Sequence, residues 1–311
     1  MHYSNLRTIL RNSRRLCAVL LVLATSTVRA EIDVVATIVP IHSLVAGVMD
    51  GVASPTLLLR ANVSPHSYQL RPSDARALED ADIVFWVGQT LETFLEGPLT
   101  KIAKKADVVA LMDNADLSLL PARKGGTWEE DEHHHEHATA LDPHIWLDPN
   151  NAKVIVEQVS AALAKADSPN AHTYRRNARQ VIARIDAMSA QGKQSLATVG
   201  NTPFLVFHDA YQYFEHHFGL KAAGAVTTHP TRAPSARRVT ELRATILHHG
   251  ARCVFHEPQF SDAVLKIILE NTPARRGQLD PLGVQLDPGP DAYFDMMAYN
   301  MEVILDCLRT P

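Results

Sequence analysis

This chain of 311 residues has no apolar run long enough to span a membrane. The run at 16–24 is much shorter than the roughly 20 residues that a membrane-spanning helix needs, and no later segment approaches that length. It follows four arginines without any acidic residue, and it precedes small residues at 28–30 that suit cleavage. Residues 1–30 are therefore predicted to be a secretory signal peptide, with a retained amphipathic anchor as the alternative. The mature chain is expected to be exported and soluble.

An excess of basic residues is also lacking. Removal of residues 1–30 takes away five arginines and no acidic residue, so the formal net charge falls from -4 to -9. Nucleic acid and anionic membranes are therefore not expected as partners. About 280 residues remain, which is enough for one large or two medium-sized domains, and an apolar fraction of 46% can supply their cores.

Cysteine is scarce, with three residues in the whole chain. Cys17 precedes the apolar run, which is the wrong place for a lipid-modified first residue of a mature lipoprotein, so it leaves with the signal. In an oxidising compartment the remaining pair, Cys253 and Cys307, favours a disulfide over a thiolate metal site. Two buried free thiols are the alternative.

Short apolar runs alternate with helical patterns along the mature chain. In the first part, strands are predicted at 33–38, 56–59, 83–87 and 108–111, and helices at 41–49, 73–79 and 91–103. In the second part, strands are predicted at 204–207, 221–226 and 253–255, and helices at 209–217, 235–249 and 261–271. Such alternation is typical of βαβ units around a parallel sheet. The chain is therefore expected to be an α/β protein with lobes at 31–167 and 200–311.

Residues 168–199 join the two predicted lobes. Ser168 and Pro169 are typical of a helix start, and apolar residues then recur at spacings of four and three. At about 1.5 Å per residue the helix would be about 45 Å long, although Gly192 weakens its last third. Unlike a glycine-serine hinge, one long helix would fix the lobe separation and limit the swing. The alternative is a long surface helix of a single domain.

Histidine, by contrast, is plentiful, and four of the 16 histidines lie in the segment WEEDEHHHEH at 128–137. These four are His133, His134, His135 and His137. Imidazoles suit zinc, copper and nickel, and the five neighbouring carboxylates add charge. A loop at 128–138 is therefore predicted to hold several divalent cations weakly, with a solvated acidic loop as the alternative. A tight zinc site needs ligands fixed in tetrahedral geometry, so it must lie elsewhere.

Three other histidines occupy positions that suit a tight site. His66 follows the strand predicted at 56–59, His208 ends the run FLVFH, and His144 lies in LDPHIWLDP. Ligands of open parallel sheets bind beyond the carboxyl ends of the strands, so His66 and His208 are expected there, and His144 could reach the same cleft from its loop. Three neutral imidazoles favour zinc, copper or nickel over manganese. Because each must be deprotonated to bind, affinity is expected to fall near and below a pH of about 6.5.

Five segments carry a resemblance to a known family: NVSPHSYQLRPSD, DPHIWLDP, VFHDAYQYFEHHFGL, CVFHEPQF and LDPLG. They resemble segments of the ZnuA-like periplasmic zinc-binding proteins of ABC transporters, within the cluster A-I solute-binding proteins. The resemblance extends over essentially the whole mature chain. It implies two (β/α)4-like lobes joined by one long rigid helix, with Zn2+ held in the cleft between them. It also implies a monomeric periplasmic protein, not an enzyme, that delivers zinc to an inner-membrane permease.

The resemblance further implies that His66, His144 and His208 are the zinc ligands and that Cys253 pairs with Cys307. Pro65 departs from the family pattern, because some relatives carry a ligating glutamate at that position. The fourth ligand is therefore expected to be water, a loop group, or Asp280 of LDPLG, which matches an aspartate ligand of related sites.

Two further residues are candidates for the surroundings of the zinc site, and two other functions are alternatives to zinc uptake. His256 and Glu257 are predicted to orient the ligands by hydrogen bonds, although a pair at a strand end is more often structural. A zinc hydrolase is the alternative function, since three histidines plus water is also a catalytic arrangement. It is disfavoured because the sequence has no HExxH motif and no evident base beside the ligands. A zinc buffer or adhesin without a transport role remains open.

Overall fold

The computed structural model describes residues 31–59, 63–123, 140–227, 234–261 and 263–309. The predicted signal peptide at 1–30 and the histidine-rich segment at 128–138 lie outside these residues. All described helices and strands belong to one compact unit, Ile32–Pro311. Among the described residues, no helix has both the length and the apolar character to cross a membrane.

The first sheet has four parallel strands in the order β2-β1-β3-β4. They are β1 (Val34–Ala36), β2 (Thr56–Leu57), β3 (Ile83–Trp86) and β4 (Asp107–Ala110). The central strands β1 and β3 are almost wholly buried, which explains their unbroken apolar sequence. The chain between these strands forms α2 (Val39–Met49), α3 (Pro72–Asp80) and α4 (Glu96–Lys101).

The second sheet repeats this arrangement, with four parallel strands in the order β6-β5-β7-β8. They are β5 (Phe204–His208), β6 (Ala222–Thr227), β7 (Cys253–His256) and β8 (Arg275–Gln278). The intervening helices are α7 (Gln212–Phe218), α8 (Ala236–His249) and α9 (Ala263–Leu269). Strand β8 was not predicted, because its sequence RRGQ has no apolar run and it becomes a strand only by pairing with β7. The predicted pair of (β/α)4-like sheets is confirmed.

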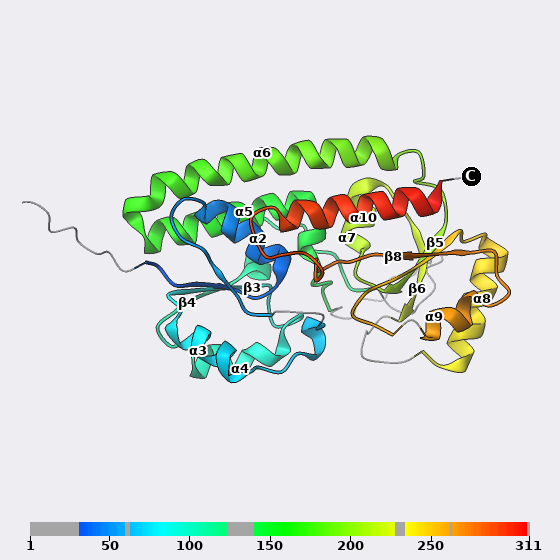
Figure 1. Cartoon of the computed structure of the whole chain (residues 1–311), viewed down its shortest axis with the longest axis horizontal. Helices are drawn as coiled ribbons and strands as arrows, with labels where there is room; N and C mark the ends of the chain where they lie inside the picture. The colour runs from blue at the N-terminus through cyan, green and yellow to red at the C-terminus, as the bar shows by residue number, and fades with distance from the viewer. Residues whose placement is uncertain (1–30, 60–62, 124–139, 228–233, 262, 310–311) are drawn as a thin grey trace, which may run out of the picture. The chain divides into compact units, whose positions relative to one another are not determined.

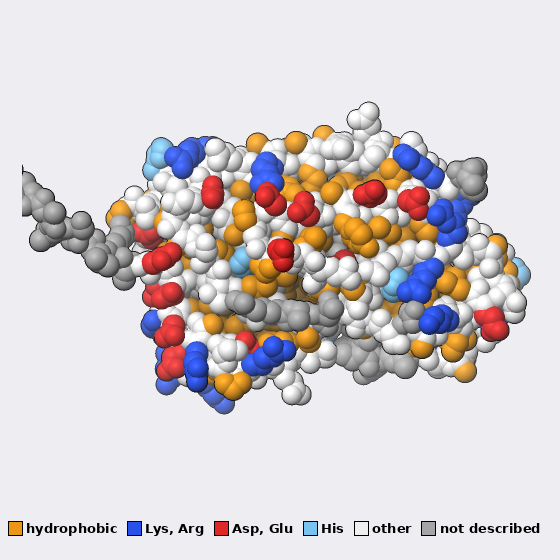
Figure 2. Space-filling view, in the orientation of Figure 1, with side chains coloured by type: hydrophobic (Ala, Val, Ile, Leu, Met, Phe, Trp, Pro, Cys, Tyr) orange, Lys and Arg blue, Asp and Glu red, His pale blue; other side chains and the backbone are white. Residues whose placement is uncertain are grey.

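The long connecting helix is α6 (Ala171–Leu196), which follows a 3-10 turn at Ser168–Asn170. Ser168 is the first residue of this turn, and Asp167 before it accepts hydrogen bonds from the side chains of Asn170 and Tyr174. Two helices that the sequence analysis missed, α5 (Pro149–Ala166) and α10 (Ala292–Leu308), pack against α6. Figure 1 shows α10 running alongside α6, and Figure 2 shows charged side chains of both signs spread over this face.

Helix α10 is a second connection between the two sheets. At the start of α10, the backbone N–H of Tyr293 donates to Ser43 Oγ in α2 (2.9 Å). The hydroxyl of Tyr293 donates to the carbonyl of Trp146 (3.0 Å). Near its end, Cys307 forms a disulfide with Cys253 in β7, which confirms the pairing implied by the resemblance. Helix α10 therefore contacts elements of both halves of the chain as well as α6.

Gly192 lets α6 pack closely against its neighbours. A Cβ at this position would lie 2.5 Å from Met301 Sδ in α10 and 2.6 Å from Phe218 Cε1 in α7. We expect Gly192→Ala to destabilise the protein by about 1–3 kcal/mol, because the buried Phe218 ring must shift. Gly97→Ala is the control, since a Cβ there would meet no described atom within 4 Å beyond its own helix backbone and chain neighbours, and alanine favours the helix. Urea unfolding measures both, and equal stability of the two variants would contradict the close-packing explanation.

Glu92 is a fully buried carboxyl group at the carboxyl end of the first sheet, where its Oε2 accepts the N–H of Gly88 (3.1 Å). Burial raises the pKa of Glu92 from 4.5 to about 7, although hydrogen bonds act in the opposite direction. A carboxyl group whose pKa is raised by folding stabilises the protein while it is protonated. This stability is present below about pH 4.5 and is lost as the pH rises through about 7.

We therefore expect Glu92→Gln, which cannot ionise, to gain stability relative to the natural protein as the pH rises. Between pH 5 and pH 8 the difference between the two proteins should change by about 2–3 kcal/mol in favour of the variant. Urea unfolding of both proteins at the two pH values, after chelation of metal, measures this change. A difference that does not vary with pH would show that Glu92 ionises normally.

Candidate metal centre

His208 stands at the carboxyl end of β5, the strand at which the order of the second sheet reverses direction. This reversal opens a crevice between the ends of β5 and β7, which is the usual ligand position in such sheets. Glu257 follows β7 directly, and its Oε1 lies 3.4 Å from Nδ1 of His208. Both side chains are buried, so the second sheet contributes an imidazole and a carboxylate to the same crevice.

His66 lies in a short 3-10 helix, Pro65–Ser67, in the segment after β2. Ser64 caps this helix, because its side chain accepts the backbone N–H of His66 (3.4 Å). Pro65 fits the first helical position, since its ring fixes φ and no N–H is needed there. The residue that departs from the family pattern therefore has a local structural role.

His144 lies just before the 3-10 helix Ile145–Leu147. Its ring Nδ1 is 2.7 Å from Oδ1 of Asp142, and its backbone N–H donates to the same oxygen (3.0 Å). With Nδ1 donating to a carboxylate, Nε2 carries the lone pair that can bind a metal. Trp146 packs against the ring and donates its indole N–H to the carbonyl of Pro281 (2.7 Å), so residues from both halves of the chain surround His144.

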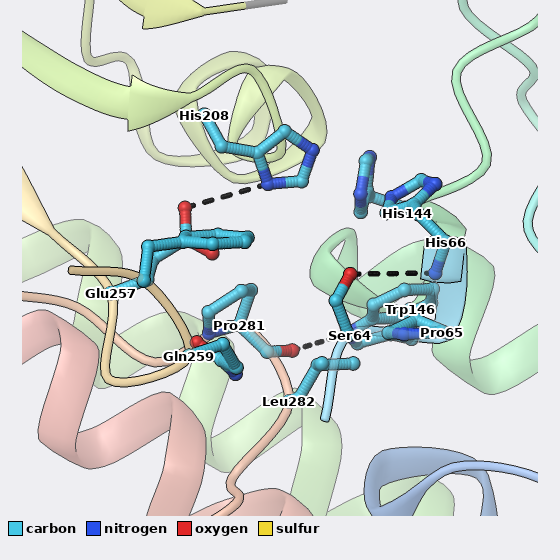
Figure 3. A pocket seen from close by; sticks show the side chains of 11 residues that line it. Ser64, Pro65, His66, His144, Trp146, His208, Glu257, Gln259, Pro281 and Leu282 are labelled. Carbon is cyan, nitrogen blue, oxygen red and sulfur yellow. Dashed lines mark hydrogen bonds and ion pairs between the residues drawn. The ribbon is translucent and has the colours of Figure 1, made fainter. Parts of the chain in front are cut away.

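The structure brings these three histidines together, as predicted. One ring nitrogen from each of His66, His144 and His208 lies within 4.8 Å of the others, and Figure 3 shows the rings facing one another. Their ring centroids are 4.9 to 5.6 Å apart. Tetrahedral zinc, with nitrogens at about 2.05 Å, would hold its ligand nitrogens about 3.4 Å apart. Small movements of the side chains would therefore suffice to coordinate one ion.

The pocket around the histidines is small and largely apolar. Its other lining residues are Ser64, Pro65, Trp146, Glu257, Gln259, Phe260, Pro281 and Leu282. The space inside suits a single ion or water molecule and not an organic substrate. Such a pocket offers a cation few polar groups, so the imidazoles and the carboxylate decide what binds.

Carboxylates make the pocket attractive to a cation. Burial lowers the pKa of His208, but the carboxylates of Glu257, Asp209 and Asp142 together raise it above its ordinary value. Protons therefore compete with a metal at His208 at a higher pH than at an ordinary histidine. The same negative charges favour a divalent cation in place of the proton.

Asp280, which was predicted as one candidate for the fourth ligand, lies outside the group of three histidines. Its carboxylate instead accepts three backbone N–H groups, those of Leu282, Gly283 and Val284. Burial raises the pKa of Asp280, although these three hydrogen bonds lower it. In this conformation Asp280 stabilises the turn after β8.

The two residues predicted to orient ligands differ in position. Glu257 lines the pocket beside His208, as expected of an orienting carboxylate. His256 does not line it, because its Nδ1 lies 2.6 Å from the carbonyl of Gly277 and its Nε2 lies 2.9 Å from Nη2 of Arg276. His256 therefore holds β7 and β8 together.

Four further residues at the site, Asp142, Trp146, Gln259 and Phe260, lie in the segments DPHIWLDP and CVFHEPQF but had no predicted role. A signal existed for Asp142, because an aspartate two residues before a candidate ligand can bond both the ring and the backbone of that histidine. No local pattern gives Gln259 or Phe260 a role in the site, and both reach the pocket because the chain turns after β7.

Residues 34–307 match the model of a protein family described as ZnuA, the periplasmic component A of a zinc-uptake complex. The chain belongs to this family. The high-affinity zinc uptake system protein ZnuA of Brucella abortus (strain 2308) is 39% identical over 304 residues, which cover 88% of this chain and 91% of that protein. The protein of the same name from Yersinia pestis is 34% identical over 306 residues, covering 93% and 95%.

Solved structures share the fold. A crystal structure of ZnuA superposes with a TM-score of 0.77 at 22% identity and covers 89% of this chain and 99% of that one. The solute-binding protein FpvC of Pseudomonas aeruginosa in complex with Mn2+ gives the same TM-score and identity, with coverage of 89% and 98%. Since a manganese-bound structure shares this fold, the fold alone does not determine the metal.

Proposed function

We propose that this protein is the periplasmic zinc-binding component of a high-affinity zinc uptake ABC transporter, which captures Zn2+ and delivers it to an inner-membrane permease. The observation that carries this proposal is the convergence of three histidines in a small buried pocket. Membership of the family supports both the transported ion and the role in uptake.

In this proposal His66, His144 and His208 are the three protein ligands, and water is the fourth. Asp280 would have to give up hydrogen bonds to three backbone N–H groups before it could bind the ion. The donor set favours zinc over manganese, which prefers oxygen ligands. It does not exclude copper or nickel, so discrimination against them would depend on geometry and metal supply.

A binding protein is favoured over a zinc hydrolase. A catalytic zinc site needs an open position to which substrate has access. The pocket has room for one ion or water molecule, and the family is defined by zinc uptake. A buffer or adhesin role would use the same site, so growth is the experiment that separates it from transport.

We propose that the signal peptide is cleaved near Ala30 and that the mature protein works as a monomer. Residues 31–167 and 200–311 would form its lobes, joined by residues 168–199. The packing of α10 against both α2 and α6 supports only a limited movement between them.

Deletion of the gene tests the transport role. Growth should be impaired when zinc is scarce and restored by added zinc. The natural protein should complement the deletion, and His208→Ala should not. His172→Ala is the control, because His172 is exposed on α6, away from the pocket. A growth defect that excess zinc does not relieve, or a zinc-dependent hydrolysis lost in His208→Ala, would contradict the proposal.

The histidine-rich segment should act separately from the main site. We expect deletion of residues 128–138 to remove weak additional zinc equivalents and to leave one tight equivalent, because loosely held imidazoles cannot replace fixed ones. Calorimetric titration of chelator-treated protein, with and without the segment, measures both classes. Loss of the tight equivalent would show that the main site is assigned to the wrong residues.

A further inference from the structure

Asp142 contacts both the backbone N–H and the imidazole ring of His144. One carboxylate oxygen, Oδ1, lies 2.7 Å from the ring Nδ1 and accepts the backbone N–H at 3.0 Å. Both residues are buried, with 3% of Asp142 and 4% of His144 exposed. A buried carboxylate in this position fixes the tautomer and the orientation of the imidazole, which directs Nε2 towards the other two histidines.

Asp142 itself belongs to a short antiparallel stem formed by residues 120–122 and 140–142. Pro121 pairs with Leu141 across the stem. The N–H of Ala122 donates to the carbonyl of residue 140 (2.7 Å), and the N–H of Asp142 donates to the carbonyl of Leu120 (2.9 Å). The position of Asp142, and therefore of His144, depends on how this stem is held.

One hydroxyl group from α7 holds the stem at its base. The hydroxyl of Tyr213 donates to the carbonyl of Asp142 (3.0 Å) and accepts the N–H of Leu120 (2.9 Å). Tyr213 is buried and lies on the helix that follows His208, so it belongs to the second sheet's half of the chain. This hydroxyl joins the two halves at the residue that orients His144.

We propose that Asp142 is a positioning residue for His144, and that Tyr213 couples this positioning to contact between the two halves of the molecule. Hydrogen bonds in proteins span about 2.5–3.2 Å, so separation of the halves by about 1 Å breaks the bond from the Tyr213 hydroxyl to the carbonyl of Asp142. Asp142 and His144 then lose a restraint, and the ion is held less tightly. This inference rests on the proposed function and explains how a tight site releases its zinc.

The first test compares Asp142→Ala and Tyr213→Phe with a matched pair of controls. Asp167 and Tyr174 are also buried, and the hydroxyl of Tyr174 donates to Asp167 Oδ2 (2.7 Å), but neither residue lines the pocket. Zinc affinity is measured by competition with a chromophoric chelator. Cobalt absorption reports ligand geometry, and melting of the metal-free protein reports folding.

We expect Asp142→Ala to weaken zinc binding by about 10–100-fold and to change the cobalt spectrum. Tyr213→Phe should weaken binding several-fold, mainly through faster zinc release. Asp167→Ala and Tyr174→Phe should lower the melting temperature and leave zinc affinity and the cobalt spectrum unchanged. If Asp142→Ala does not fold, Asp142→Asn keeps the shape of the side chain and should still alter the spectrum. Zinc affinity and a cobalt spectrum like those of the natural protein in a folded Asp142 variant would overturn the inference.

A double-mutant cycle tests the coupling. If Tyr213 acts through Asp142, adding Tyr213→Phe to the folded Asp142 variant should cause little further loss of zinc affinity. The same loss in both backgrounds would overturn the coupling. Failure of the proposed function is distinguishable, because the natural protein would then lack a tight zinc equivalent. Tight zinc binding by the natural protein together with unaffected Asp142 and Tyr213 variants would refute only this inference.

Discussion

Replacing His66, His144 or His208 with alanine is expected to weaken tight zinc binding by at least tenfold, which corresponds to about 1.4 kcal/mol or more. Each substitution removes one of the three imidazoles that, among the described residues, approach a common point. The remaining two cannot complete a tetrahedral site without additional water. Competition with a chelator of known zinc affinity measures the loss for each variant.

Two comparisons make this result specific. His172→Ala should bind zinc like the natural protein, because the exposed His172 side chain does not line the pocket. Asp280→Ala should cost less than the histidine variants if water is the fourth ligand, and an equal cost would make Asp280 a ligand. Full affinity in any one histidine variant would remove that residue from the site.

Loss of the disulfide should have the largest effect on stability. We expect the double substitution Cys253→Ser and Cys307→Ser to destabilise the protein by about 4 kcal/mol, because the bond closes a loop with a sequence separation of 54 residues. The bond ties β7 to α10, and α10 also contacts α2 and α6. Urea unfolding of the metal-free protein measures the change.

Reduction provides the control for this prediction. A reducing agent should destabilise the natural protein by a similar amount and leave the double variant unchanged. Thiol counting on native protein should find no free thiol at Cys253 or Cys307. Two reactive thiols in the native protein would contradict the prediction.

Much of the fold could be predicted because it depends on local patterns. Buried parallel strands such as β3 and residues 204–207 of β5 are unbroken apolar runs, and α6 shows the expected helical spacing. Strand β8 could not be predicted in this way, because its residues gain a strand conformation only from their partner β7. The sequence of α6 likewise contains Gly192 without showing that Met301 and Phe218 pack against it.

The sequence by itself indicated the three histidines of the candidate site, because His66 and His208 follow or end predicted strands and His144 lies in a segment that resembles the family. Only the tertiary structure decided which other groups surround them. Tyr213 reaches Asp142 across 71 residues of chain, and Trp146 reaches Pro281 across 135. Hydrogen bonds act only over about 3 Å, so they depend on how the two sheets and their helices pack, which local periodicity does not specify.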